Sequence, residues 1–152
     1  MSVYDKLSAI GISLPSVTPS VALFVPFVRT GNLIFRVRAT SRGGTASPGS
    51  AGSRSTSPSR TDARPQRGIA IELLGALHAA TSDLNSITRI VKLLVLVNSA
   101  PAFTEPHVVA NGASELFNEV FGDRGPHARS AIGVAQLPLG ACVEIELIAE
   151  VA

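Results

Sequence analysis

Histidine and cysteine, the side chains that most often carry metal or nucleophilic chemistry, are scarce in this chain of 152 residues. His78 falls in a predicted helix, His107 at a helix start and His127 just before a strand. Because the three share no ligand spacing, surface or capping roles are expected and no metal site. Cys142, the single cysteine, cannot form an internal disulfide, and we expect a small buried strand residue rather than a nucleophile.

An arginine and a carboxylate in the last quarter of the chain, Arg129 and Glu144, are the other candidates for chemistry. A planar guanidinium can hold a carboxylate through two parallel charge-assisted hydrogen bonds. A carboxylate can position water or accept a proton from it. The sequence alone leaves simpler roles open: Arg129 as a structural ion-pair partner, perhaps of Glu144, and Glu144 as a solvated strand residue.

The positive charge of the protein is concentrated in one segment. The whole chain has 13 Lys and Arg, 11 Asp and Glu, and a formal net charge of +2. Seven of the arginines and one acid lie between Arg36 and Arg67, which leaves six basic and ten acidic residues elsewhere. Nucleic acid is therefore not expected to bind the remainder, which is mildly acidic.

Apolar spacing and turn residues predict the elements of the first third of the chain. Residues 2–14 predict a short helix with Ser2 as N-cap, ending near Pro15. Residues 21–35 hold two apolar runs separated by Thr30-Gly31-Asn32, which predicts a hairpin. Pro26 places the first strand of this hairpin at a sheet edge or a bulge.

The second half alternates helical and strand patterns. Residues 68–84 predict a helix, residues 86–99 a long buried strand, and residues 104–122 a second helix with Asn111-Gly112 at a kink or helix start. Residues 128–151 predict two strands joined as a hairpin, with carboxylates on one face of the last strand and aliphatic residues on the other. This order predicts an α+β domain, a mixed sheet with two helices on one face, whose second face lines a subunit interface.

Length and apolar content limit the organisation. With 152 residues, 45% of them apolar, we expect a single domain over residues 1–152 with its own core. No basic leader with an apolar run behind it begins the chain, and no apolar run has the length of a membrane helix. A cytoplasmic protein without membrane contact is expected.

The segment from residue 36 to 67 departs from this pattern. It is rich in Ser, Arg, Gly, Pro and Ala and nearly without core-forming residues, so residues 38–66 are expected to be disordered. A pair of compensating frameshifts in a GC-rich gene would produce such a composition. An inert flexible loop and an arginine-rich RNA-binding arm are the alternatives.

Several pieces of the chain resemble the RidA/YjgF family, formerly called L-PSP: VKLLVLVNSAPAF, NGASELFNEVFG, HARSAIGVAQLP and VEIELIAEV. The most specific is ARS-x-x-x-VA-x-LP followed by V-E-I-E-x-IA, and the resemblance extends over residues 1–35 and 68–152. It implies a chorismate-mutase-like fold and a homotrimer with a central barrel. It also implies three sites in the clefts between neighbouring subunits and no cofactor.

The resemblance implies an enamine or imine deaminase, which hydrolyses 2-aminoacrylate-like compounds to 2-keto acids and ammonia. Arg129 would hold the substrate carboxylate, Glu144 would position or deprotonate the water, and Phe24, Asn111 and Ser130 would line the substrate site. The chain departs from the family pattern at three places, and those at Phe24 and at the Ser-Gly-Gln motif favour a non-catalytic trimer that binds a small carboxylate. An RNA-binding or RNA-cleaving protein is a further alternative. The departures are Phe24 without the family's hydroxyl, Ala131 in place of a cysteine, and Arg36-Val37-Arg38-Ala39 in place of Ser-Gly-Gln.

Overall fold

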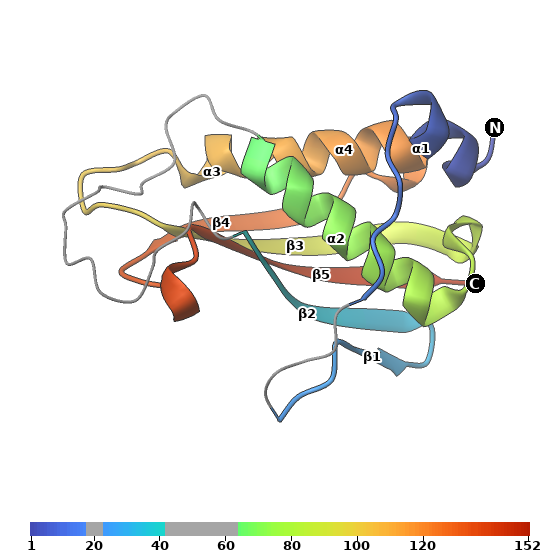
Figure 1. Ribbon diagram of the computed structural model, residues 1–152, viewed down its shortest axis with the longest axis horizontal. Coiled ribbons are helices and arrows are strands. Elements are labelled where there is room, and N and C mark those ends of the chain that lie inside the picture. Colours follow the sequence, from blue (N-terminus) through green and yellow to red (C-terminus); the bar gives the residue numbers. More distant parts are fainter. Residues whose placement is uncertain (18–22, 42–63) are drawn as a thin grey trace.

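A five-stranded mixed sheet carries the helices on one of its faces (Figure 1). The computed structural model describes residues 1–17, 23–41 and 64–152. The spatial order of the strands is β1-β2-β5-β3-β4, with β3 and β4 parallel and the other neighbours antiparallel. The strands are β1 (Phe27–Thr30), β2 (Leu33–Ser41), β3 (Ile87–Asn98), β4 (Ala128–Val134) and β5 (Val143–Val151).

Among the described residues, four α-helices and three short 3-10 turns accompany the strands. The α-helices are α1 (Val3–Ala9), α2 (Arg64–Thr81), α3 (Pro106–Val109) and α4 (Asn111–Phe121). The 3-10 turns are η1 (Leu84–Ser86), η2 (Gly122–Arg124) and η3 (Pro138–Gly140). Figure 1 shows α2 and α4 lying across the same face of the sheet, which confirms the predicted α+β layering.

Local chemistry explains where the two N-terminal elements begin in the structure. Ser2 caps α1 in a capping box with Asp5, whose carboxylate accepts the Ser2 backbone N–H at 2.8 Å. The predicted hairpin is formed by β1 and β2, but its first strand begins at Phe27, after Pro26. Since proline has no N–H to give to a neighbour, β1 is a short edge strand, as expected.

The predicted hairpin over residues 128–151 is wrong. β4 and β5 lie on opposite sides of β3 and do not pair with each other. The parallel connection from β3 through α3 and α4 returns the chain to the outer side of β3. The turn at η3 then carries it across to pair with β3 from the other side.

The boundaries predicted for a disordered segment, 38–66, were too wide. Residues 38–41 belong to β2, which pairs with β5 through backbone groups and therefore needs no apolar run. Residues 64–66 begin α2, where Pro65 is suited to the first helical turn because it lacks an N–H. Residues 42–63, the rest of the segment, lie outside the described residues.

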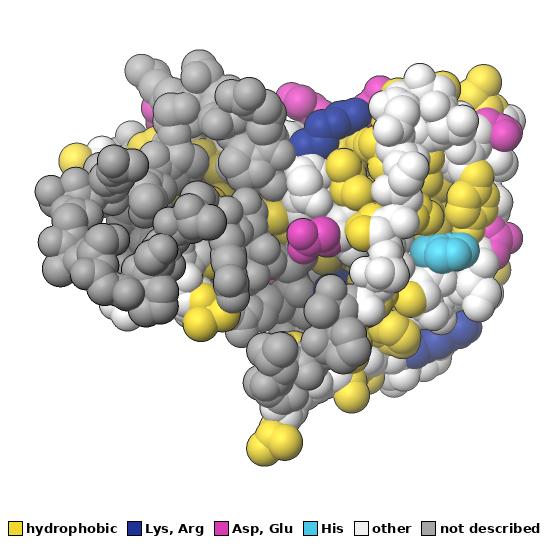
Figure 2. Space-filling view, in the orientation of Figure 1, with side chains coloured by type: hydrophobic (Ala, Val, Ile, Leu, Met, Phe, Trp, Pro, Cys, Tyr) yellow, Lys and Arg dark blue, Asp and Glu magenta, His cyan; other side chains and the backbone are white. Residues whose placement is uncertain are grey.

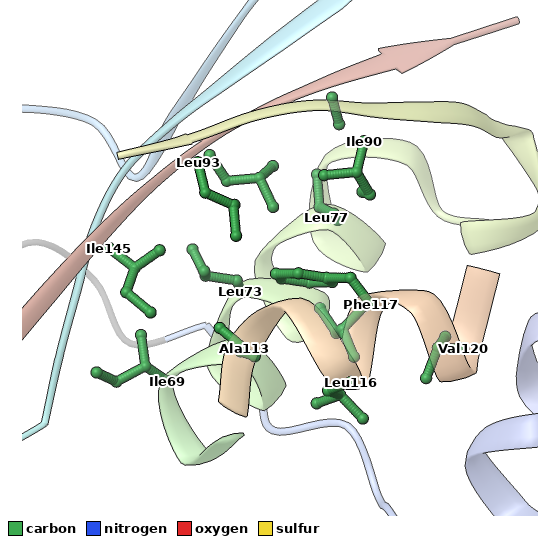
Figure 3. Packing of buried hydrophobic residues seen from close by; sticks show 14 of the residues in the cluster. Ile69, Leu73, Leu77, Ile90, Leu93, Ala113, Leu116, Phe117, Val120 and Ile145 are labelled. Atoms are coloured by element: carbon green, nitrogen blue, oxygen red, sulfur yellow. The ribbon is translucent and has the colours of Figure 1, made fainter. Parts of the chain in front are cut away.

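The core lies between the sheet and the helix layer. Figure 3 shows α2, α4 and the sheet directing aliphatic side chains and the ring of Phe117 toward one another. The largest fully buried side chains are Phe117, Ile34, Ile69, Leu73, Leu74, Leu77, Leu84, Ile87, Ile90, Leu93, Leu116 and Ile145. Among the described helices, none has both the length and the apolar character needed to cross a membrane.

Because α2 contacts the N-terminal segment closely at one point, alanine substitution at two glycines of this helix should change the free energy of unfolding in opposite directions. A Cβ added at Gly75 would lie 2.5 Å from the carbonyl oxygen of Pro15, whereas at Gly68 it would meet nothing within 4 Å. Gly75→Ala should lower the free energy of unfolding by about 1–3 kcal/mol through overpacking. Gly68→Ala should raise it by about 0.5–1 kcal/mol, the usual gain in a helix. Urea denaturation of both variants measures the difference, and equal effects would contradict this packing.

Candidate functional site

Arg129 lies on β4, the edge strand, and its side chain points to the helix-covered side of the sheet. Its register partner on β3 is Leu93, which is fully buried under the helices. Ala131, two residues along the strand, packs against the same core. Since side chains two apart on a strand share a face, the strand itself sets this orientation.

Three hydrogen bonds hold the guanidinium of Arg129 against α3 and α4. Its Nη1 donates to Asn111 Oδ1 at 3.1 Å and to Ser114 Oγ at 2.9 Å, and its Nη2 donates to the carbonyl oxygen of His107 at 3.1 Å. Asn111 is the first residue of α4, which starts anew after the break at Ala110, and Ser114 lies one turn further on the same face. The structure therefore brings together two predicted site residues, Arg129 and Asn111.

All three acceptors of Arg129 are uncharged. An amide oxygen, a hydroxyl and a backbone carbonyl orient the guanidinium but leave its positive charge uncompensated. Within the described ranges no carboxylate forms an ion pair with Arg129, and two of its five N–H groups, the one on Nε and one on Nη2, have no acceptor. A single carboxylate accepts two N–H donors in a bidentate contact, and Arg129 has two available.

His127 extends this network, which the sequence did not indicate. Its Nδ1 lies 2.7 Å from the carbonyl oxygen of Gly125 and its Nε2 lies 3.0 Å from Ser114 Oγ. A carbonyl can only accept, so the neutral ring carries its hydrogen on Nδ1 and Nε2 accepts the hydroxyl hydrogen of Ser114. The edge-to-face contact with Phe117, with centroids 6.2 Å apart, fixes the plane of the imidazole.

The surroundings favour the neutral form of His127. Burial lowers the pKa of the imidazole, the hydrogen bond to Gly125 opposes this effect, and the nearby Arg129 cation lowers the pKa further. The signals that could have found this residue were its position two residues before Arg129 and the spacing of Asn111 and Ser114 on one helical face. Neither is distinctive without the fold.

Glu144, the predicted general base, lies on the opposite face of the sheet. Its neighbours Val143 and Ile145 are fully buried under the helices, so the Glu144 side chain points to the opposite face of the sheet. No described helix covers this face, which is called the uncovered face below. Its register partner on β3 is Leu96, and Ser130 of β4 shares this face. A single chain therefore does not bring Arg129 together with Glu144 or Ser130, and the simple interpretation of an intrachain Arg129–Glu144 ion pair is wrong.

Phe24 is also distant from Arg129 within one chain. It lies in a bend before β1, with 39% of its surface exposed. β1 and β4 are the two opposite edges of the sheet, so three strands separate them. The structure does not bring Phe24 to the Arg129 network.

Arg36 occupies the place where the family resemblance implies Ser-Gly-Gln. Its register partner on β5 is Leu147, which is buried under the helices, so Arg36 points toward α2. Its Nη1 donates to the carbonyl oxygen of Pro26 at 2.6 Å. Burial lowers the pKa of Arg36 and the nearby carboxylate of Glu72 opposes this, while burial raises the pKa of Glu72 against the effect of Arg36. Arg36 therefore has a structural environment away from the Arg129 network.

The remaining candidates for chemistry have structural surroundings. His78 Nδ1 lies 3.0 Å from the hydroxyl of Tyr4, which also accepts the backbone N–H of Leu84 at 2.9 Å. The His107 side chain is exposed, and Cys142 is buried as expected. No group of three metal-binding side chains occurs in the part of the chain that the structure describes.

The helix-covered side has no concentrated charge among its described residues. Figure 2 shows the Lys and Arg side chains on this side separated from one another by apolar, acidic and uncharged surface. One ion pair on the surface joins Arg67 of α2 to Glu119 of α4 at 3.1 Å. This distribution differs from the continuous basic surface typical of nucleic-acid binding.

The environment of His127 predicts a pH-dependent stability. Well above pH 6.5 His127 is neutral in both states, but as the pH falls through about 6.5 the unfolded chain binds a proton before the folded chain does. The free energy of unfolding should therefore fall as the pH drops below 6.5, until the folded imidazole also becomes protonated. His127→Gln lacks this titrating group, so its free energy of unfolding should fall less between about pH 7 and pH 5 than that of the wild type. Urea denaturation at several pH values measures this difference. An equal fall of the free energy of unfolding in the two proteins would contradict a lowered pKa of His127.

Comparison with known proteins agrees with this architecture. The sequence model of the family described as Endoribonuclease L-PSP matches residues 46–151. Protein TCP17 of Trypanosoma cruzi is 52% identical over 85 residues, which are 55% of this chain and 53% of that protein, so the chain spans about half the length of this curated relative.

Solved structures extend the comparison to nearly the whole chain. The protein Atu1372 of Agrobacterium tumefaciens, described as of unknown function, is 35% identical with a TM-score of 0.81, over 99% of this chain and 92% of that one. TdcF of E. coli, solved with bound serine, shares the fold at 19% identity and a TM-score of 0.58, over 88% and 92% of the two chains. The mixed sheet, its helix layer and the family match together show that this chain belongs to the L-PSP family, the RidA/YjgF proteins.

Proposed function

We propose that the protein hydrolyses small imines or enamines that carry a carboxylate, releasing a 2-keto acid and ammonia. The observation that best supports this proposal is the environment of Arg129. Three neutral acceptors orient its guanidinium, and two of its N–H donors are still available. Such a guanidinium binds an anion without first breaking an ion pair, so its charge is fully used on the ligand. Serine, the molecule bound to TdcF, carries a carboxylate of this kind.

The proposed reaction begins with the substrate carboxylate on Arg129 and the imine carbon beside it. Water attacks this carbon while Glu144 takes a proton from the water, and the C=N electron pair moves to nitrogen, which accepts a proton from solvent. The carbon–nitrogen bond of the resulting carbinolamine then breaks, the hydroxyl gives its proton to solvent as the carbonyl forms, and ammonia leaves. Each turnover consumes one water, and the proton taken by Glu144 returns to the leaving nitrogen.

Two chains are needed to build this site, because Arg129 and Glu144 point to opposite faces of one sheet. We place Arg129 of one subunit against the uncovered sheet face of the next, so that the partner subunit's Glu144 reaches the substrate. A closed cyclic assembly repeats this contact at every interface. A homotrimer, as the family resemblance implies, would hold three such sites.

The uncovered face of the sheet supports this assembly. Apolar side chains of β3 and β4 share it with carboxylates of β5: Leu94, Leu96 and Ile132 with Glu144 and Glu146. Ile132 is 50% exposed on the single chain. An apolar sheet face is normally covered by protein, and contact with a neighbouring subunit would cover this one.

Two other functions remain as alternatives. A binding protein without catalysis is favoured by the position of Phe24 and by Arg36, which points toward α2 where the family resemblance implies Ser-Gly-Gln. RNA cleavage is favoured by the description of the family, Endoribonuclease L-PSP. An RNA activity that depends on the arginines between residues 42 and 63 should vanish when this segment is deleted and should fall steeply with salt, whereas carboxylate binding should not.

Substitution of the two proposed residues should abolish catalysis in different ways. Arg129→Lys keeps the charge but loses the planar fork, so KM should rise at least about tenfold. Glu144→Gln should lower kcat by about 100-fold or more with little change in KM, because a general base is lost. Ammonia and keto-acid release from freshly generated 2-aminoacrylate is the assay, with assembly verified by light scattering.

Glu146→Gln is the matched control for Glu144→Gln. Glu146 lies on the same face of β5, two residues along the strand, and opposite Leu94. Its substitution should leave kcat within about twofold if Glu144 is the base. Equal losses in the two variants would point to the charge of the whole face rather than to one base, and an inactive wild-type trimer that still binds a keto acid would favour the binding protein.

Mixed assemblies should test whether two chains build the site. Arg129→Ala and Glu144→Gln subunits should each be inactive alone. When they are unfolded together in equal amounts and reassembled, about a quarter of the interfaces should combine an intact Arg129 with an intact partner Glu144. Recovery of activity to about this fraction is expected, and no recovery in a well-formed mixed trimer would contradict a shared site.

A further inference from the structure

The hydrogen bonds around Arg129 continue beyond it in an uninterrupted line. The carbonyl of Gly125 accepts from His127 Nδ1, His127 Nε2 accepts from Ser114, and Ser114 Oγ accepts from Arg129. The three distances are 2.7, 3.0 and 2.9 Å. None of these residues except Arg129 is needed for the proposed chemistry, so the line requires a separate explanation.

We propose that His127 is a positioning residue for Arg129, acting through Ser114, and that carboxylate binding at Arg129 is coupled to the protonation of His127. This inference rests on the proposed function only in taking Arg129 as the carboxylate-binding residue. It concerns the control of binding and does not require that the bound compound be hydrolysed.

The single hydrogen of the Ser114 hydroxyl provides the coupling. With neutral His127 this hydrogen points at Nε2, and a lone pair of Oγ is directed at Arg129. When His127 is protonated, both of its ring nitrogens are donors, so Oγ accepts from two cations at once and its hydrogen must turn elsewhere. Only one oxygen atom then separates two positive groups, which is unfavourable unless an anion is nearby.

Other charged groups around His127 do not offset this effect. Among the described charged groups, Arg129 is the one that shifts the pKa of His127. α4 contacts it through Ser114 and Phe117, and η2 through the carbonyl of Gly125. The remaining charged residues on α4, η2 and β3 are exposed or bonded elsewhere: Glu115 and Glu119 of α4, Asp123 and Arg124 of η2, and Arg89 and Lys92 of β3.

A carboxylate on Arg129 should therefore favour the protonated imidazole. Burial and the Arg129 cation both lower the pKa of His127 in the empty site, and a bound anion cancels the effect of the cation. Reciprocity requires that protonation of His127 strengthen carboxylate binding by the same factor. The affinity should thus rise as the pH falls through the range in which His127 titrates, by about tenfold for each unit by which the ligand raises its pKa.

The test uses pyruvate, a stable 2-keto acid, as the probe, and follows the imidazole signals of the assembled protein by NMR. Saturating pyruvate should raise the pKa of His127 and leave the signals of His78 unchanged. His78 is a matched internal control, since it is also half-buried and bonded to a hydroxyl, that of Tyr4, but is not in the Arg129 network. An unchanged His127 pKa at saturating pyruvate would overturn the inference.

Two variants separate positioning from general stability. His127→Gln retains an acceptor for the Ser114 hydroxyl but cannot be protonated, so pyruvate affinity should stay near the wild-type value at high pH and lose its pH dependence. Ser114→Ala breaks the line, so affinity should fall several-fold and the NMR shift of His127 on binding should shrink. A wild-type pH dependence in His127→Gln would overturn the coupling.

The same measurements distinguish this inference from the proposed function. Binding that disappears in Arg129→Ala but shows no link to His127 would overturn the inference alone. Binding that is linked to His127, without any ammonia release from 2-aminoacrylate, would support the inference and overturn the deaminase. Binding that persists in Arg129→Ala would overturn both, because Arg129 would then not hold the carboxylate.

Discussion

The alternation of side chains along the strands is the constraint on which the site depends. On β4 it turns Arg129 toward the helices, and on β5 it turns Glu144 toward the uncovered face. The buried residues on either side of Glu144 pack into the core, so neither strand can slip by one residue without exposing apolar surface. The core therefore separates the two proposed functional groups within a chain, and chemistry that uses both becomes a property of an assembly.

The break between α3 and α4 helps to provide Arg129 with uncharged hydrogen-bond acceptors. In a continuous helix the carbonyl of His107 would accept the backbone N–H of Asn111, whereas here it accepts from Arg129, on the same face as the amide of Asn111 and the hydroxyl of Ser114. An arginine paired to a carboxylate contributes to the structure, whereas one oriented by neutral acceptors can still bind an anion. His127 adds a titratable group to the same network.

Most elements could be predicted because their signals are local. The capping box at Ser2, the hairpin turn at Gly31 and the alternation in β5 follow from residues close together in the chain. The pairing of β4 was mispredicted because a tight connection also permits a strand to cross over a neighbour. The ends of the segment rich in Ser, Gly and Arg were mispredicted because strand pairing and helix starts depend on backbone bonds that composition does not reveal.

By itself the sequence determined the class of fold and the family and indicated Arg129 and Asn111 as candidate site residues, since motif and periodicity are properties of neighbouring positions. Tertiary structure alone decided that Arg129 has no acidic partner among the described residues and that Ser114 links it to His127 by hydrogen bonds. It also decided that Glu144 points to the other face of the sheet. The physical reason is that these relations join residues on different elements. Sheet order and helix placement set the distances between such residues, and these arise only when the whole core packs.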